Sequence, residues 1–169
     1  MKSVNMIIVL LSVADYSYAQ SNLCNSRMSR TAPDTRYQIL SNGYEVIDKK
    51  TNLIWQRCSL GQTFNGQDCV GSATAHTWSK ALQIAQGQGN GWRLPNVKEL
   101  SSLIEEACEK PSINIGIFPN TLSEFYWTST VATSIHAWTV HFSGGVVYIR
   151  DEGTGMNNLY YARLVRSVK

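Results

Sequence analysis

Alternating apolar and polar residues mark the C-terminal third of the chain as β structure. Residues 136–142 read HAWTVHF, which places Trp138 and the next apolar side chains on one face of an extended chain and polar side chains on the other. A Ser-Gly-Gly turn follows, and residues 146–150 return as a second strand. Residues 125–130 and 160–166 are predicted as further strands.

A second hairpin is predicted in the first half of the chain. Apolar and polar residues alternate over 44–48, and residues 53–55 form another apolar run. The intervening sequence DKKTN is typical of a turn. This hairpin adds antiparallel β structure ahead of the helices.

Two amphipathic helices are predicted between the β regions. The first begins at Trp78, because Thr77 can cap it, and ends at the glycine-rich residues 87–91. The second begins after Asn96, which forms a variant of the capping box with Glu99.

The apolar residues of the second helix continue at helical spacing beyond its first turns. They are Val97, Leu100, Leu103, Ile104 and Ala107. We therefore predict that this helix extends to Lys110 and Pro111. The order of elements predicts an α+β fold, a single compact domain of antiparallel β hairpins with two helices.

The N-terminus has the features of a secretory signal peptide. Residues 1–19 combine a positively charged start, an apolar run at 6–14 and a small residue at Ala19 before the predicted cleavage site. The apolar run is much shorter than the ~20 residues that span a bilayer. We predict export to the periplasm or cell surface, an extended lead-in at 20–42 and a domain at 43–169.

The composition narrows the class of protein. The chain has 169 residues, of which 43% are hydrophobic, 10% aromatic and 16% charged, and its formal net charge is +3. This is not the composition of a disordered polyelectrolyte. The small net charge and the absence of a dense Lys/Arg run argue against a nucleic-acid partner.

The four cysteines predict two structural disulfides in an exported domain. Three connectivities are possible. Cys58 and Cys69 flank a short glycine-containing segment and are paired as a local loop, which leaves Cys24 with Cys108. No CxxC or HxxxH pattern occurs, so we predict neither a metal site nor a cofactor.

Seven short signatures occur in order along the chain. They are DKKTNLIWQRC (48–58), TWSKAL (77–82), GWRLPNVKEL (91–100), PSIN-x3-FPN (111–120), YWTST (126–130), AWTVHFSGG (137–145) and ARLVRS (162–167). Together they resemble the Lcl C-terminal domain family over about residues 42–168. The resemblance implies an exported or surface domain whose fold is allied to C-type-lectin-like domains. For the collagen-like adhesin that names the family, it also implies binding of sulfated polysaccharides.

Several residues within these signatures are predicted to be structural. Trp92 can serve as a sugar-stacking platform and Arg93 as an anion clamp, but packing in the core and pairing with Glu99 are the favoured interpretation. The predicted structural residues are Trp55, Trp92, Arg93, Leu94, Pro95, Asn96, Glu99, Trp127 and Trp138.

Residues near the C-terminal loops are the predicted ligand contacts. They are Tyr148, Arg150, Tyr160, Tyr161 and Arg163. The carboxylate-containing triplets with which C-type lectins hold calcium are absent, so no dedicated calcium site is expected.

The RLPN segment at 93–96 is similar to a segment of the formylglycine-generating enzymes, which need a cysteine pair late in the chain. The last cysteine here is Cys108, and this difference argues against that activity. We predict a secreted, non-catalytic binding module for glycans or surface polymers. The alternatives are a protein-interaction or assembly subunit of a cell-envelope structure and, third, an enzyme.

Overall fold

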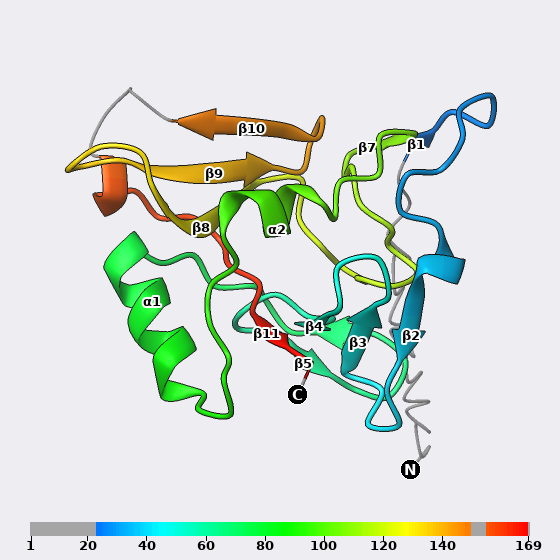
Figure 1. Cartoon of the computed structure of the whole chain (residues 1–169), viewed down its shortest axis with the longest axis horizontal. Coiled ribbons are helices and arrows are strands. Elements are labelled where there is room, and N and C mark those ends of the chain that lie inside the picture. Colours follow the sequence, from blue (N-terminus) through cyan, green and yellow to red (C-terminus); the bar gives the residue numbers. More distant parts are fainter. Residues whose placement is uncertain (1–22, 150–154, 169) are drawn as a thin grey trace, which may run out of the picture.

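Antiparallel sheets form the body of the molecule (Figure 1). The computed structural model describes residues 23–149 and 155–168. Within these ranges, the larger sheet has the strand order β11-β4-β3-β2. Its strands are β2 (Tyr37–Ile39), β3 (Glu45–Asp48), β4 (Leu53–Gln56) and β11 (Val165–Ser167). The hairpin of β3 and β4 confirms the prediction for this segment.

The smaller sheet has the strand order β10-β9-β8 in the described part of the chain. Its strands are β8 (Phe125–Val131), β9 (Ala137–His141) and β10 (Val146–Ile149). The register places Val146 opposite His141, which confirms the predicted hairpin. Its turn needs glycine at Gly145, because a Cβ there would lie 2.6 Å from the Ile104 side chain.

Two short strand pairs lie outside these sheets, and a disulfide accompanies each. Strand β1 (Leu23–Cys24) pairs with β7 (Cys108–Glu109), and β5 (Thr63–Phe64) pairs with β6 (Cys69–Val70). The disulfides are Cys24–Cys108 and Cys58–Cys69, and they confirm the predicted pairing of all four cysteines.

Both helices begin where the capping residues predict. Helix α1 (Trp78–Gly87) follows Thr77, whose hydroxyl accepts a hydrogen bond from the Lys80 backbone. Helix α2 (Val97–Ser101) has the full capping box formed by Asn96 and Glu99. The 3₁₀ turns η1 (Asp34–Arg36) and η2 (Gly155–Asn157) complete the helical elements of the described residues.

The predicted length of the second helix is wrong, because α2 ends at Ser101. A local turn at 102–104 follows, and Glu105 then hydrogen-bonds to distant segments instead of continuing the helix. The Glu105 carboxylate accepts hydrogen bonds from the backbone N–H of Thr31 and Ala32, at 3.0 and 2.9 Å. Its own backbone N–H donates to the Ser112 carbonyl at 3.1 Å. The last of these contacts satisfies the Glu105 N–H, which a longer helix would have paired with a carbonyl of its preceding turn.

The predicted final strand also differs, because β11 begins at Val165. Residues 160–164 instead connect the two sheets. Tyr161 makes an isolated bridge with Tyr126 of β8, and Val165 then pairs with Trp55 of β4. A continuous strand would have stayed in one sheet.

The core contains two clusters of buried side chains. One includes Trp55 and Leu100, and the other includes Trp127 and Ala81 of α1. Trp138 is half-buried. The observed elements confirm an α+β single domain stabilised by disulfides, while the relationship to C-type-lectin-like folds stays a prediction.

The segment expected as a lead-in contributes to this body. Tyr37 lies in the core and begins β2, and Arg36 forms a buried ion pair with Asp48. Burial opposes ionisation of Asp48, but hydrogen bonds from Arg36 and Thr51 lower the pKa of its carboxyl. The predicted signal peptide lies outside the described residues. Among the residues that are described, no helix is long and apolar enough to cross a membrane.

Candidate functional site

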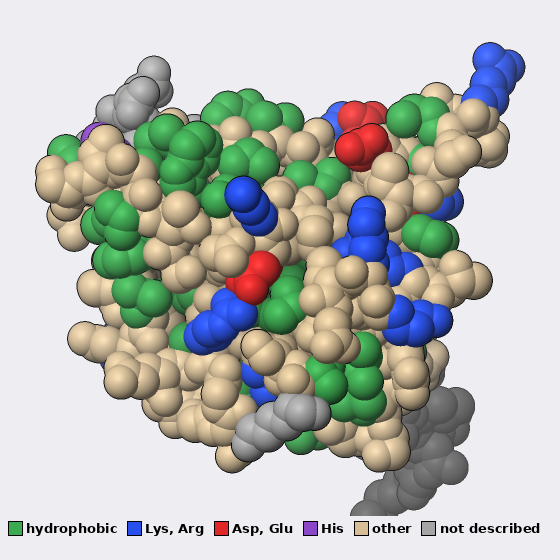
Figure 2. Space-filling view, in the orientation of Figure 1, with side chains coloured by type: hydrophobic (Ala, Val, Ile, Leu, Met, Phe, Trp, Pro, Cys, Tyr) green, Lys and Arg blue, Asp and Glu red, His purple; other side chains and the backbone are tan. Residues whose placement is uncertain are grey.

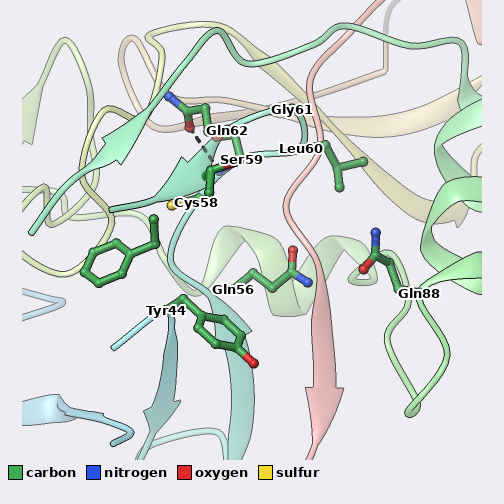
Figure 3. A pocket seen from close by; sticks show the side chains of 10 residues that line it. Tyr44, Gln56, Cys58, Ser59, Leu60, Gly61, Gln62 and Gln88 are labelled. Carbon is green, nitrogen blue, oxygen red and sulfur yellow. Dashed lines mark hydrogen bonds between the residues drawn. The ribbon is translucent and has the colours of Figure 1, made fainter. Parts of the chain in front are cut away.

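A groove of about 310 Å³ lies beside the Cys58–Cys69 loop (Figure 3). Residues from β4, the disulfide loop and the end of α1 converge on it. The lining residues are Tyr44, Gln56, Cys58, Ser59, Leu60, Gly61, Gln62, Thr63, Phe64 and Gln88. None of these lining side chains is acidic, basic or an imidazole. We refer to this region as the groove.

The disulfide loop is held against its neighbours by close backbone contacts. Gly61 has φ +91°, and a Cβ there would lie 2.7 Å from the backbone nitrogen of Thr74. The Thr74 N–H donates a hydrogen bond of 2.8 Å to the Leu60 carbonyl at the same place. Only glycine therefore allows the wall of the groove to approach this closely.

Two aromatic rings contribute to the groove from different segments. The Phe64 ring lies under the Arg57 guanidinium, with 4.8 Å between the guanidinium carbon and the ring centre. A Cβ at Gly43 would lie 2.9 Å from this ring, so the ring has little room to move on that side. Tyr44 is 47% exposed and offers its ring to solvent.

The amide side chains in the groove fall into two kinds. Gln62 is fixed, because its carbonyl accepts from the Ser59 N–H at 3.1 Å and its NH₂ donates to the Asn120 carbonyl at 3.2 Å. In Figure 3, Gln56 lies between Tyr44 and Gln88. Within the described ranges, the side chains of these last three residues make no hydrogen bond with other protein groups. Their polar atoms are therefore available to a ligand.

A buried guanidinium lies beneath the floor of the groove. Arg163 is completely buried and donates hydrogen bonds to the Gln56 carbonyl at 2.9 Å and to the Thr121 hydroxyl at 2.6 Å. It also contacts Ser59, whose hydroxyl lies 2.8 Å from the Tyr126 hydroxyl. Burial lowers the pKa of Arg163 to about 10, which still leaves it charged at neutral pH.

Arg57 adds a second buried positive charge to this floor. Its guanidinium donates to the backbone carbonyls of Ile117 at 2.8 Å and Gly43 at 2.7 Å. Burial lowers the pKa of Arg57, and the charge of Asp68 partly offsets this effect. Among the described residues, neither Arg57 nor Arg163 forms a direct ion pair with a carboxylate. The side chains that line the groove are therefore uncharged, and two buried guanidiniums lie next to the lining residues Gln56, Ser59 and Phe64.

Two of the predicted ligand contacts come together elsewhere, at Phe125 of the smaller sheet. Tyr148 and Tyr160 both pack against Phe125, with ring centres 5.8 and 5.2 Å apart. Phe125 also stacks on His141 at 4.1 Å. We refer to Phe125, His141, Tyr148 and Tyr160 as the aromatic stripe. Its rings already contact one another.

The remaining predicted contacts do not join this set. Arg163 is completely buried, so its prediction as a ligand contact is wrong: residues 160–164 cross between the sheets, and its side chain turns inward. Tyr161 is half-buried and packs against Tyr126. Arg150 lies outside the described residues.

The residues predicted to be structural hold the entry to α2. Trp92 and Leu94 are buried, and Arg93 donates two hydrogen bonds of 2.8 Å to the Glu99 carboxylate. The Pro95 carbonyl accepts from the Ser129 N–H of β8 at 2.8 Å. These contacts join α2 to the smaller sheet and leave no exposed platform at Trp92.

The sequence did not identify the groove residues. Tyr44, Gln56 and Gln88 come from three separate segments, and none stands in a pattern that predicts binding. The one available signal was the uncharged, glycine-containing segment closed by Cys58 and Cys69. Within the described ranges, no three His, Cys, Asp or Glu side chains converge as metal ligands would.

One known family matches a region of the chain that includes all residues lining the groove. Residues 44–166 match the family described as the Lcl C-terminal domain, as the seven signatures suggested. No curated protein matches the chain. The matched region also includes both sheets apart from β2 and the end of β11, but not Cys24. The chain therefore belongs to the Lcl C-terminal domain family.

Proposed function

We propose that this protein is an exported, non-catalytic module that binds a glycan or another surface polymer in the groove. The observation that carries the proposal is the combination of exposed aromatic surface with amides that have no hydrogen-bond partner among the described residues. Tyr44 supplies the ring, and Gln56 and Gln88 supply the amides. A sugar presents C–H faces that pack on rings and hydroxyls that hydrogen-bond to amides.

The charge beneath the groove favours an acidic polymer over a basic one. Arg57 and Arg163 are buried without a direct ion pair in the described structure, so their charges act on the groove above them. Interactions of this kind weaken as salt rises, but less steeply than those of fully exposed charges. Acidic sugars, whether carboxylated or sulfated, supply both the C–H faces and hydroxyls for the groove lining and a negative charge for the buried guanidiniums.

Export and the absence of catalysis rest on separate observations. Two disulfides are typical of proteins that fold in an oxidising compartment, and residues 1–19 have the pattern of a cleaved leader. The groove lining offers no acid–base pair. Its one buried hydroxyl, that of Ser59, hydrogen-bonds to Tyr126 and Arg163 rather than to a general base.

The test uses the oxidised mature domain, residues 20–169, on a glycan array and a heparin column at low salt. We expect retention of acidic glycans and elution as salt rises. Tyr44→Ala should weaken retention, whereas Tyr148→Ala on the aromatic stripe should not. A clean array together with no retention at low salt would contradict the proposal.

An assembly role is the second candidate, and exposed apolar residues favour it. Ile135 and Leu159 are each more than 60% exposed, and the Ile135 carbonyl accepts a hydrogen bond from η2, which precedes Leu159. Figure 2 shows hydrophobic side chains gathered along the upper part of the face in view, over the smaller sheet. Cross-linking in intact cells that captures one stable envelope partner through Ile135 would support this role. Loss of capture with Ile135→Ser is its control.

A further inference from the structure

The two disulfides lie in very different surroundings. Cys58 and Cys69 are both buried. Cys24 is exposed, while its partner Cys108 is only 5% exposed. Thiol–disulfide exchange requires that an attacking thiolate reach a sulfur atom, so Cys24 is the most accessible of the four.

A cation lies directly beside the exposed disulfide. One guanidinium nitrogen of Arg30 is 2.5 Å from the Cys108 sulfur and 3.0 Å from the Cys24 sulfur. A neighbouring positive charge stabilises a thiolate, and a more stable thiolate is a better leaving group. Arg30 also pairs with Glu105 at 3.4 Å, which holds the guanidinium in place and moderates its charge.

The chain around Cys24 lies on the surface, and this disulfide is its covalent link to β7. Residues 23–30 are all exposed, and β1 pairs with β7 over two residues. The Asn25 N–H also donates to the Ala107 carbonyl at 2.7 Å, and the backbone N–H groups of Thr31 and Ala32 donate to Glu105. Opening the disulfide would therefore leave residues 23–30 held by a few non-covalent contacts at the surface, with the core in place.

A cavity of about 480 Å³ surrounds the same bond. It is lined by Leu23, Cys24, Asn25, Met28, Glu106, Ala107, Cys108, Glu109 and Gly144. Leu23 and Met28 are exposed apolar side chains within it. A polypeptide that carries a thiol therefore has room and apolar surface with which to approach Cys24.

We propose that Cys24–Cys108 is a thiol-exchange site for a protein dithiol. The incoming thiolate attacks the Cys24 sulfur and forms a mixed disulfide with it. The Cys24–Cys108 bond breaks, and its electron pair leaves on Cys108 as a thiolate beside Arg30. The second thiol of the partner then displaces Cys24, so that the partner is oxidised to a disulfide and Cys24 and Cys108 are both reduced.

This inference does not depend on glycan binding, and the second disulfide provides an internal control. The folded, oxidised domain is incubated with reduced glutathione as a monothiol probe, quenched by alkylation and mapped by peptide mass spectrometry. We expect Cys24–Cys108 to open at least about tenfold faster than Cys58–Cys69, with glutathione attached to Cys24. Near-ultraviolet circular dichroism should stay native while only this bond is open.

Arg30→Gln tests the role of the cation, with the exposed Arg27→Gln as the matched control on the same segment. Arg30→Gln should slow opening about threefold or more, and Arg27→Gln should leave the rate unchanged. Equal opening rates for the two disulfides, glutathione on Cys108, or loss of the native spectrum on opening would each overturn the proposal. So would equal rates for the two variants.

Discussion

The groove and the aromatic stripe both contain partly exposed rings, but they differ in whether their side chains already contact other side chains of the protein. In the stripe, Phe125 packs against His141, Tyr148 and Tyr160, so part of each ring's surface is already covered by another ring. In the groove, Tyr44 is exposed, and the amides of Gln56 and Gln88 have no hydrogen-bond partner among the described residues. A cluster of aromatic residues is therefore weaker evidence for a binding site than a few groups left without partners on a rigid support.

The support also differs between the two regions. Three members of the stripe, Phe125, His141 and Tyr148, lie on the strands of a regular sheet, and Tyr160 packs against Phe125. The groove depends on a loop that has little regular structure and is closed by the Cys58–Cys69 disulfide. Removing that covalent constraint should therefore affect one region and not the other.

The largest loss of binding is expected from Cys58→Ser combined with Cys69→Ser. A disulfide that closes a short loop contributes about 2–4 kcal/mol to stability, and without it Phe64 and Gln62 lose their fixed positions. We expect binding of heparin fragments to disappear in calorimetry at a temperature where the variant is still folded. The control pair Cys24→Ser and Cys108→Ser should keep binding. Unchanged heparin binding by the Cys58→Ser, Cys69→Ser variant would show that the groove is not the binding site.

The next largest effect is expected from Tyr44→Ala. An exposed ring that packs on a ligand is a typical hot spot, and its loss should weaken binding about tenfold. The unfolding temperature should change little, because the ring is 47% exposed. Tyr148→Ala, at a tyrosine that is also exposed, should bind like the wild type. The opposite result, in which Tyr148→Ala binds more weakly than Tyr44→Ala, would indicate that the ligand binds on the aromatic stripe.

A smaller effect is expected when one amide is removed from the groove. A hydrogen bond to a ligand contributes about 0.5–1.5 kcal/mol, so Gln56→Ala or Gln88→Ala should weaken binding roughly two- to tenfold. Gln86→Ala, at an exposed position on α1 outside the lining, is the matched control. Titration calorimetry distinguishes these values. Equal affinity in all three variants would mean that the amides do not contact the ligand.

The smallest effect is expected from pH between 6 and 8. The groove lining has no carboxylate, imidazole or amine, so affinity there should stay constant. A strong pH dependence of binding in this interval would therefore argue against binding in the groove.

Protein stability should not interfere with that measurement. Burial opposes ionisation of Asp48 and Glu105, but hydrogen bonds lower the pKa of both carboxyls below their ordinary values of 3.8 and 4.5. Carboxyls of this kind stabilise the fold above their unfolded pKa values, and the contribution is lost only as pH falls through the lower folded values. Thermal unfolding should therefore move to lower temperature in acid, well below pH 6.

The parts of the fold that follow from local sequence were predictable. The capping residues Thr77 and Asn96 marked the helix starts, and alternation marked the β9–β10 hairpin. The errors came from long-range contacts. The Glu105 carboxylate accepts hydrogen bonds from the backbone N–H groups of Thr31 and Ala32, and no sequence pattern near Glu105 predicts these contacts.

The candidate site was harder to predict than the fold for the same reason. Arg163 follows two tyrosines that were predicted to be exposed, but its side chain points into the core where the chain crosses between the sheets. Gln56 and Gln88 are ordinary surface residues until β4 and the end of α1 are brought together. Local periodicity contains no information about which distant segments meet.

The most direct test of the central claim is a map of ligand contacts by nuclear magnetic resonance. A heparin tetrasaccharide is titrated into the oxidised domain while the glutamine side-chain amides and the aromatic protons are observed. The account predicts saturable shifts at Gln56, Gln88 and Tyr44, with Tyr148 and Tyr160 unchanged. Shifts confined to Tyr148 and Tyr160 would contradict it.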